Sequence, residues 1–391
     1  MKRILILCDT DPNISPRPNR MIEWLKKNYH VTVVGRKLSQ ADNIEDSFVI
    51  IPSGLFGTLV NRSLAKNTKE LLIRLIMFIK KDYEGLIWAS IGQPIALQSL
   101  LATKKFDLII THDCTLLPFA FSIKGDRSTK IMLDAREFYP RNFNDQLLWR
   151  KMVRPINEYL CENYLSKCNK TITVSDGIAK EYKLSYQIPS EVIMSMPQQW
   201  ELSPMQVKKD KFKLVHHGSA TPSRKIEFMI EMMDYVDERF SLELMLVGQG
   251  RYLEKLRRLT KNRANVKIIP PVKMQEIVPM TNRYDIGLFL CPPTNFNLKY
   301  ALPNKLFEFI QARLAVAIGP SIEMKKIVDT HNCGVVSSDF KPQTMAMALN
   351  NISSCDEIMH FKKQSHKAAL KLNAEANRKR IGEIVENLLE I

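Results

Sequence analysis

The sequence predicts an α/β protein built from two doubly wound parallel sheets, and three observations lead to that prediction. Short apolar runs alternate with longer helical patterns along the whole chain. The runs are continuously apolar, which is typical of parallel strands covered on both faces. The 391 residues are too many for one ordinary core, and the composition changes to that of a linker between residues 192 and 212.

In the first half of the chain, six apolar runs are expected to form strands. These are residues 3–7, 31–35, 48–51, 107–112, 130–134 and 171–175. Helical patterns separate them. In residues 19–28, for example, Met21, Ile22 and Leu25 share one face. A strand–helix alternation of this kind predicts an open Rossmann-like sheet.

The same pattern begins again after the linker. Strands are expected at residues 213–218, 243–250, 266–269, 285–290 and 315–319, and one helix at 224–237. The predicted domain limits are an N-terminal domain at 1–196, a linker at 197–211, a C-terminal domain at 212–365 and a C-terminal helix at 366–391 that packs back across the junction. Because ligands of open α/β sheets bind at the carboxyl ends of the strands, the functional loops are expected there, in a cleft between the domains.

Composition narrows the class of protein. The seven cysteines form no CxxC pair, so we expect buried free thiols in a reducing compartment. No secretory signal is recognisable, and the longest apolar stretch, residues 71–79, is too short to span a bilayer. A cytoplasmic protein is expected. Its net charge of +16 favours an anionic partner, but no nucleic-acid-binding motif is recognisable and no His, Cys or carboxylate grouping has metal-ligand spacing.

The loop in "HHGSATPSRKIEFMIEMM" (216–233) is the first candidate for ligand binding. It follows a predicted strand and enters a helix, so its backbone N–H groups would favour an anion. Arg224 or Lys225 could then neutralise a diphosphate; the alternative is an ordinary loop with a solvated Arg-Lys pair. In "LVGQGRYLEKL", Gly248 and Gly250 supply half of a dinucleotide fingerprint and are interpreted as a tight turn near a nucleotide.

The stretch "YALPNKLFEFIQARLAVAIGPSIEM" (300–324) is the second candidate. A helix is expected to start near Pro303 or Asn304, with Lys305 and Glu308 on one face. A carboxylate can accept hydrogen bonds from both hydroxyls of a ribose, and a lysine suits phosphate. The alternative is an exposed ion pair, which would contribute well under about 1 kcal/mol.

Two further features each allow two interpretations. His112 ends a predicted strand, so it is either a structural histidine or one that faces the substrate; its expected position at the cleft favours the second role. Residues 61–83 carry six basic residues around an apolar core. That segment is either a basic surface that meets an anionic membrane or an internal helix with charged edges.

In order and spacing, these motifs resemble the donor half of the retaining GT-B glycosyltransferases of family 4. The segments on which this resemblance rests are "LVGQG", "YDIGLFL" and "PNKLFEFIQARLAVAIG". In the first half, "NRMIEWLKKNYHVTVVG", "FDLIITHD", "LDAREFYP" and "NKTITVSDGIAKEY" resemble the corresponding units of the same family. The likeness runs through about residues 1–340, and it implies a GT-B fold, a metal-independent reaction and a nucleotide-diphosphate sugar of the UDP or GDP type as donor substrate, without a further cofactor.

The resemblance also implies site residues. Glu308 would hold the ribose, Arg224 and Lys305 would face the diphosphate, and His112 would approach the transferred sugar. The remaining nucleotide contacts implied are Gly218, Ser219, Gly248 and Asn304. The remaining substrate contacts expected are Arg17, Arg20, Glu137, Asn297 and Tyr300.

This chain departs from the family at several of those positions. Tyr300 stands where a second Glu is usual, so sugar contacts would come from Asn295, Asn297 or the backbone. The usual Gly-Gly of the first loop is replaced by residues 9–20, where Arg17 and Arg20 are candidate acceptor or phosphate contacts. Arg136 stands where the family has a His.

The function predicted is that of a hexosyltransferase type that moves a sugar, with retention, to an oligosaccharide or lipid-linked acceptor in bacterial surface polysaccharide synthesis, such as capsule or lipopolysaccharide. The enzyme would be cytoplasmic and peripheral on the inner face of the membrane, reached through residues 61–83. Two alternatives stay open: a non-catalytic partner subunit with this fold, and a nucleotide-sugar epimerase using Asp113 and Glu137.

Overall fold

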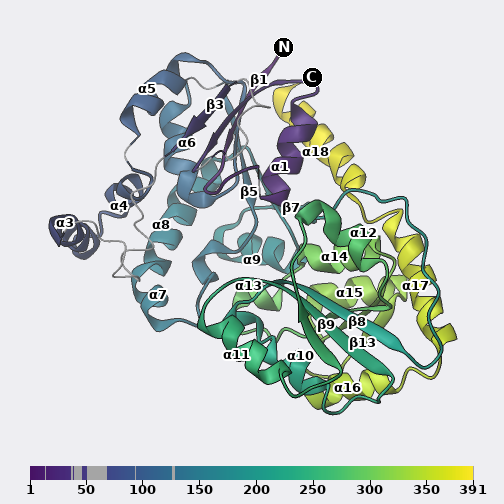
Figure 1. Cartoon of the computed structure of the whole chain (residues 1–391). Coiled ribbons are helices and arrows are strands. Elements are labelled where there is room, and N and C mark those ends of the chain that lie inside the picture. The colour runs from purple at the N-terminus through teal and green to yellow at the C-terminus, as the bar shows by residue number, and fades with distance from the viewer. Residues whose placement is uncertain are drawn as a thin grey trace. The chain divides into compact units, whose positions relative to one another are not determined.

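The computed structural model describes residues 1–13, 15–36, 38, 46–50, 68–92, 94–125 and 128–390, except for the side chains of residues 46 and 68–73. The chain divides into two compact units (Figure 1). Unit 1 comprises Met1–Met194, Asn295–Asn297 and Arg378–Ile391, and unit 2 comprises Ser195–Thr294 and Leu298–Asn377.

Unit 1 is built on a parallel sheet with the order β3-β2-β1-β4-β5-β6-β7, which has seven strands in the described residues. The strands are β1 Arg3–Leu7, β2 His30–Gly35, β3 Asp46–Val49, β4 Leu108–Thr111, β5 Lys130–Ala135, β6 Lys170–Thr173 and β7 Ser190–Val192. The order reverses between β1 and β4, which pair in register from Ile4↔Leu108 to Leu7↔Thr111. That point is where ligands of doubly wound folds bind.

Helices flank this sheet. They are α1 Pro16–Leu25, α3 Thr68–Ile79, α4 Tyr83–Ser90, α5 Ile95–Thr103, α6 Leu117–Ile123, α7 Leu147–Met152, α8 Arg154–Tyr164, α9 Asp176–Tyr186 and, from the end of the chain, most of α18 Ala374–Leu389. The apolar side chains of Ile381, Ile384, Val385 and Leu389 on α18 join the core formed by α1 and the central strands. The C-terminal helix thereby completes the hydrophobic core of unit 1.

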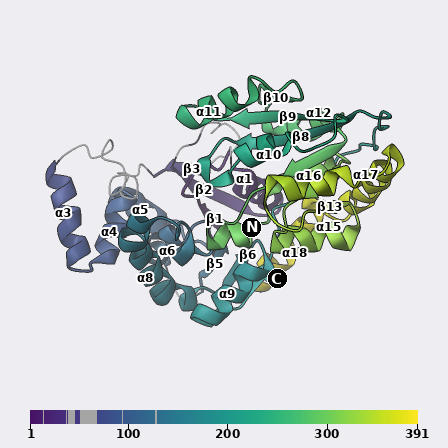
Figure 2. The same ribbon diagram turned by 90° about the horizontal axis from the view of Figure 1, so that it is seen from below.

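Unit 2 repeats the topology with the order β10-β9-β8-β11-β12-β13. Its parallel strands are β8 Phe212–Ser219, β9 Phe240–Val247, β10 Val266–Ile269, β11 Ile286–Phe289, β12 Ala315–Ile318 and β13 Gly334–Val336. Its helices are α10 Glu227–Met232, α11 Arg251–Thr260, α12 Ile277–Thr281, α13 Phe296–Lys299 (which begins in unit 1), α14 Asn304–Gln311, α15 Ile322–His331, α16 Pro342–Asn350 and α17 Cys355–Ala369. α14 packs on α17. α10 packs on α16 (Figures 1 and 2).

The predicted fold class, two Rossmann-like parallel sheets of the doubly wound type, is confirmed. Three details differ. The edge strands β7 and β13 were not predicted, because each has three half-exposed residues and no long apolar run. The helix expected at 224–237 is a 3-10 turn, Pro222–Arg224, followed by the short α10, because Lys225 adopts a left-handed conformation (φ 48°) between them.

The helical tail is divided as well. The helix expected at 366–391 begins inside α17, and the chain leaves the helical conformation after Ala369 before α18 starts at Ala374. Among the described residues, no single helix combines the length and apolarity needed to cross a bilayer; only the bent pair α4 and α5, at 87° to one another, passes that test jointly.

Candidate functional site

Helix α14 lies close against the unit 2 sheet because β11 provides a glycine beneath it. A Cβ on Gly287 would overlap the ring of Phe309, so only glycine permits this packing. The helix begins at Asn304, after Pro303 at the N-cap. The predicted start is therefore confirmed, and the second residue of the helix is Lys305.

Lys305 has a buried side-chain amine, with 5% of the residue's surface exposed. Its Nζ lies 3.2 Å from Nε2 of His216 and 4.5 Å from the ring centroid of Phe289. Nδ1 of His216 lies 2.9 Å from the carbonyl oxygen of Leu288, which favours the tautomer that donates there and leaves Nε2 to accept from Lys305. Burial, and then the charge of Arg224, lower the pKa of Lys305 well below its usual value.

Arg224 and Lys305 converge on Gly218, at the end of β8. A Cβ on Gly218 would lie 3.1 Å from Nζ of Lys305 and 3.8 Å from an Nη of Arg224. Gly218 also has a φ of +130°, which disfavours other residues. Within the described part of the chain, no carboxylate lies within ion-pair distance of either cation. We call these three residues the cationic edge; two basic side chains without a counter-ion among the described residues can hold an anion.

Glu308, one turn further along α14, lies beside the second histidine of β8. Its Oε2 is 3.5 Å from Nε2 of His217. Burial, followed by the charges of Lys305 and Arg224, lowers the pKa of His217 to about 3, so this imidazole is neutral near pH 7. The contact is therefore not an ion pair.

In unit 1, His112 is held by a buried carboxylate. Its Nδ1 lies 2.9 Å from Oδ2 of Asp134, and both side chains are fully buried. Burial lowers the pKa of His112, so the ring is neutral with its proton on Nδ1. Nε2 is left as an acceptor, and neither ring nitrogen makes a hydrogen bond of normal geometry with a described residue.

The structure gives Arg17 a different role from the ligand contact expected. Its Nε and Nη2 donate to the two carboxylate oxygens of Asp134, at 2.6 and 2.7 Å, and Nη1 donates to the carbonyl of Ile193 at 2.6 Å. With 8% of its surface exposed, Arg17 acts as the counter-ion of Asp134 inside unit 1. Burying the carboxylate requires this cation.

Asn297 is likewise used within unit 1 instead of facing a sugar. Its Oδ1 accepts from the backbone N–H of Phe138 at 2.8 Å, and its Nδ2 donates to the carbonyl of Phe138 at 3.3 Å. Its side chain thereby fixes the loop after β5.

The other predicted positions lie on several different elements. Arg20 is half-buried on α1, and burial raises the pKa of Glu137 after β5. Tyr300 is half-exposed beneath Lys299, whose Nζ lies 5.5 Å from its ring. Ser219 and Gly248 are exposed after β8 and β9, and Asn304 is half-buried at the start of α14.

Three charged residues are brought together at the carboxyl edge of the unit 1 sheet, of which the sequence analysis assigned only Asp113 to a substrate, and only in the epimerase alternative. Asp9 follows β1, Asp113 follows β4 and Arg136 follows β5. An Nη of Arg136 lies 2.9 Å from Oδ1 of Asp9 and 3.9 Å from Oδ2 of Asp113. We call these three residues the acidic edge. The signal that could have found them is that each residue comes within two positions of the end of a buried strand.

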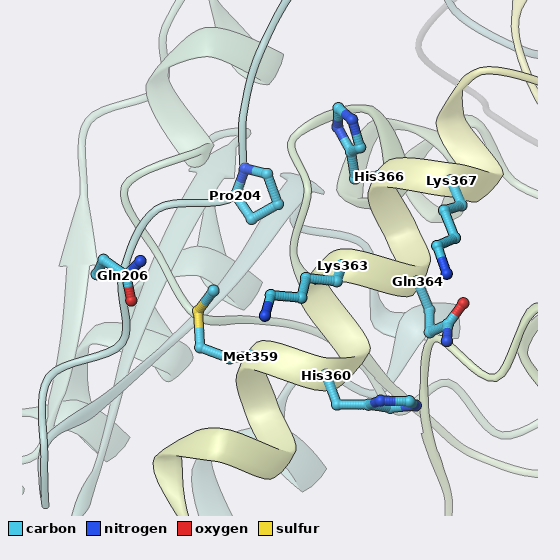
Figure 3. A pocket seen from close by; sticks show the side chains of 8 residues that line it. All are labelled: Pro204, Gln206, Met359, His360, Lys363, Gln364, His366 and Lys367. Carbon is cyan, nitrogen blue, oxygen red and sulfur yellow. The ribbon is translucent and has the colours of Figure 1, made fainter.

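A separate pocket of about 530 Å³ lies between α17 and the segment that precedes β8 (Figure 3). It shares no residue with the cationic edge. Its lining comprises Pro204, Gln206, Met359, His360, Lys363, Gln364, His366 and Lys367. Its histidines have partners: Nδ1 of His366 lies 3.0 Å from Nε of Arg313, and Nε2 of His360 lies 3.2 Å from Nδ2 of Asn332.

Comparisons with known proteins found no matching family model and no curated relative. Solved structures do match. A glycosyltransferase from Rickettsia africae ESF-5 has a TM-score of 0.70 and 11% identity, covering 99% of each chain. Alr3699/HepE from Anabaena, in complex with UDP-glucose, has a TM-score of 0.68 and 12% identity, covering 99% of this chain and 100% of that one. WaaG, a glycosyltransferase involved in lipopolysaccharide biosynthesis, has a TM-score of 0.64 and 13% identity, covering 96% and 98%.

These likenesses show the fold. At 11–13% identity the chain shares with these glycosyltransferases a pair of Rossmann-like domains, the GT-B architecture, over nearly its full length.

Proposed function

We propose that the protein is a glycosyltransferase that moves a sugar from a nucleotide-diphosphate sugar to a hydroxyl of a glycan or lipid-linked acceptor. The observation that carries the proposal is the cationic edge. Lys305 and Arg224 meet at a glycine, at the switch point of a Rossmann sheet, without an ion-pairing carboxylate among the described residues. A diphosphate supplies the missing negative charge.

The predicted site residues of unit 2 then each contribute to donor binding. Lys305 and Arg224 hold the diphosphate and stabilise the charge that grows on it as the glycosidic bond breaks. Glu308, whose carboxylate is kept next to a neutral histidine, accepts hydrogen bonds from the ribose hydroxyls. The Gly218–Ser219 and Gly248 turns let the backbone approach the phosphates.

The reaction proposed retains the anomeric configuration. The bond from the anomeric carbon to the phosphate oxygen breaks, the acceptor oxygen takes its place on the same face, and the acceptor proton passes to the departing diphosphate. In unit 1, the unpartnered Nε2 of His112 would accept a hydrogen bond from a substrate hydroxyl. UDP as the nucleotide is supported by HepE in its complex with UDP-glucose, with GDP as the alternative, and surface polysaccharide synthesis as the setting is supported by WaaG.

The test is nucleotide binding followed by turnover. Thermal-shift and calorimetric titrations with UDP, GDP, ADP and CMP should show one nucleoside diphosphate that stabilises the protein, by about 2.7 kcal/mol at 100 times its Kd. Glu308→Gln should weaken that binding about 10- to 100-fold, because a carboxylate makes stronger hydrogen bonds than an amide. The control Glu254→Gln changes an exposed residue of α11 and should leave the Kd unchanged.

Other results would redirect the assignment. Binding of no nucleotide would refute it. Conversion of the donor to a free isomer without an acceptor would indicate the epimerase alternative, and nucleotide binding without turnover would indicate a partner subunit. Retention is tested by NMR of the anomeric proton in the product.

We also propose that unit 1 meets an anionic membrane through the end of α3. Leu75, Ile76 and Ile79 are exposed there by 42%, 44% and 70%, next to the exposed Lys80 and Lys81. Apolar side chains beside cations suit the interface of an anionic bilayer.

Part of the basic segment predicted at 61–83 does not enter this argument. Residues 61–67 and the side chains of 68–73 lie outside the described residues. Arg74 is 3% exposed, so its guanidinium is buried instead of lying on the surface.

Flotation with phosphatidylglycerol vesicles tests the membrane proposal. The double variant Lys80→Gln, Lys81→Gln should bind about 30-fold more weakly, at about 1 kcal/mol per lysine. Vesicles of phosphatidylcholine alone are the control, and equal binding to both kinds of vesicle would contradict the proposal.

A further inference from the structure

The imidazole of His216, in β8, is fully buried and is fixed by three neighbours. Nδ1 lies 2.9 Å from the carbonyl oxygen of Leu288. The ring lies parallel to that of Phe289, with the planes at 5° and the centroids 5.8 Å apart. Nε2 lies 3.2 Å from Nζ of Lys305. Because a carbonyl oxygen can only accept, Nδ1 carries the proton and Nε2 presents a lone pair to the amine of Lys305.

Lys305 is thus held by groups that carry no charge. Besides the lone pair of His216, its Nζ faces the ring of Phe289, 4.5 Å from the centroid, and the face of an aromatic ring attracts a cation. An ammonium group has three N–H donors, and His216 accepts one of them. Among the described residues, Nζ makes no other hydrogen bond and no ion pair. Two donors are therefore left for a ligand.

The missing side chain of Gly218 leaves a space that both basic groups of the cationic edge border. The point that a Cβ of this residue would occupy lies 3.1 Å from Nζ of Lys305 and 3.8 Å from an Nη of Arg224. A carboxylate in the place of His216 would orient the amine equally well, but it would also neutralise it and repel a phosphate. A neutral imidazole orients the amine and leaves its charge uncompensated.

We propose that His216 is a positioning residue for the diphosphate of the donor. It accepts a hydrogen bond from Lys305, directs the other N–H groups of the amine toward the space at Gly218, and adds no negative charge that would compete with the ligand. His216 acts through Lys305 and does not itself contact the nucleotide. The inference rests on the proposed function, since it assigns a further residue to the same site.

The surroundings of His216 keep its lone pair available. Burial, and then the charge of Lys305, lower the pKa of His216 well below its usual value. His217 and Arg224 act in the same direction, and the hydrogen bond with the carbonyl of Leu288 opposes them. The imidazole is therefore neutral near pH 7 and can accept from an ammonium group.

The surroundings of Lys305 determine how the role of His216 depends on pH. Burial, and then the charge of Arg224, lower the pKa of Lys305. Cys291 and Glu308 act in the opposite direction. A hydrogen-bond acceptor for the amine favours its charged form, so removal of the imidazole lone pair should lower the pKa of Lys305 further while the other groups stay in place.

The test is a double-mutant cycle on the Kd of whichever of UDP, GDP and ADP binds best, measured by calorimetry on the full chain. His216→Phe keeps a ring beside Phe289 but removes the acceptor, and it should weaken binding about tenfold. In a chain that already carries Lys305→Met, the same change should weaken binding less than about twofold, since the amine that His216 supports is absent. Equal losses in the two backgrounds would overturn the proposal.

His216→Gln separates the hydrogen bond from packing. Its amide oxygen can accept from Lys305 in the place of Nε2, so the Kd should stay within about threefold of that of the unchanged protein. If His216→Phe does not fold, His216→Leu, which also lacks an acceptor, replaces it in the cycle. Binding by folded His216→Gln as weak as that of the variant without an acceptor would contradict the proposal. The control His360→Gln changes an exposed histidine of α17 and should leave the Kd unchanged.

The pH profile of affinity is a readout that damage to the fold alone would not move. The loss in His216→Phe should shrink toward acid pH, where the amine of Lys305 is protonated with or without the acceptor, and grow as the pH rises. A loss of the same size at every pH would contradict the positioning role. In ¹⁵N NMR, His216 should be neutral with its proton on Nδ1 near pH 7, and a doubly protonated ring would overturn the proposal.

Failure of this inference is distinguishable from failure of the function on which it rests. If no nucleotide binds to the unchanged protein, the proposed function itself fails. If a nucleotide binds and Lys305→Met weakens that binding, but His216→Phe does not, the proposed function stands and His216 is a packing residue of the sheet.

Discussion

The two sheets of this protein have the same strand order around their switch points, yet the loops at their carboxyl ends carry opposite chemistry. In unit 1, Asp9 and Asp113 follow the two central strands and share Arg136. In unit 2, the equivalent edge presents Lys305 and Arg224 at a glycine turn. The shared topology places both edges, and the side chains determine what each of them can bind.

The two edges also differ in how their charges are compensated. Unit 1 neutralises its deepest charge internally: Asp134 is bonded to Arg17 and lies beside His112, and all three are buried. Unit 2 leaves Lys305 buried beside a neutral histidine and an aromatic ring. A buried charge that is paired within the chain has its desolvation cost offset, whereas a buried charge without a counter-ion costs stability and can be used by a ligand.

The largest effect expected on this comparison comes from Asp134→Asn. The change leaves the guanidinium of Arg17 buried without its counter-ion, and the free energy of unfolding should fall by about 3–5 kcal/mol in urea denaturation. The control Asp107→Asn affects a partly exposed pair with Lys2 and should cost less than about 1 kcal/mol. Equal losses of unfolding free energy in the two variants would show that the buried pair of Asp134 and Arg17 contributes no more to stability than the partly exposed pair.

The carboxylate of Asp134 also allows a prediction of how the stability of the fold depends on pH. Burial alone would raise the pKa of Asp134, but Arg17 and His112 outweigh it and hold the pKa well below its usual value. A carboxyl with a depressed folded-state pKa contributes stability above its unfolded pKa of about 3.9 and loses it as the pH falls below that value. Acid denaturation of Asp134→Asn should therefore lack this component.

The second largest effect is expected from the substitution Lys305→Met. Nucleotide affinity should fall about 100-fold, which corresponds to about 2.7 kcal/mol, because the diphosphate loses a buried cation. The melting temperature of the ligand-free protein should stay the same or rise, since a buried cation with no ion-pairing carboxylate is removed. The control Lys299→Met lies on the exposed end of α13 and should change neither quantity. A loss of both affinity and stability would make Lys305 a structural residue.

Gly218→Ala should have the third largest effect, about 1–3 kcal/mol in the free energy of unfolding. The new Cβ would approach Nζ of Lys305 to 3.1 Å, and the φ of +130° strains any residue but glycine. Gly125→Ala is the matched control, because a Cβ there meets nothing within 4 Å. Urea denaturation measures both variants, and a neutral Gly218→Ala would show that the turn can adjust.

The smallest effect is a proton linked to nucleotide binding. Burial lowers the pKa of Lys305 in the free protein, and a bound diphosphate favours its charged form, so binding should take up a proton. Affinity should then fall as the pH rises between the free and bound pKa values, by up to tenfold per unit. Calorimetry in two buffers of different ionisation enthalpy gives the proton number. A value of zero, or proton release, would contradict a ligand role for the buried amine.

The sequence alone determined the class of fold, because a long apolar run needs no knowledge of its neighbours to be recognised as a buried strand. "RILIL", "VKII" and "AVAI" are strands for that reason. The start of α14 was also predictable, because Pro303 suits a helix start whatever surrounds it. The three-residue strands β7 and β13 were missed, since at the edge of a sheet neither face has to be apolar.

Only the tertiary structure decided which charges are paired within the chain and which have no counter-ion among the described residues. Arg17 and Asp134 are 117 residues apart, and Arg136 and Asp9 are 127 apart, so no local pattern connects them. The sequence alone does not distinguish an arginine that neutralises a buried carboxylate from an arginine that binds a phosphate. The difference is electrostatic and depends on which groups the fold places within a few ångströms. Arg17 contacts the carboxylate of Asp134. Lys305 contacts the neutral imidazole of His216 and the aromatic ring of Phe289.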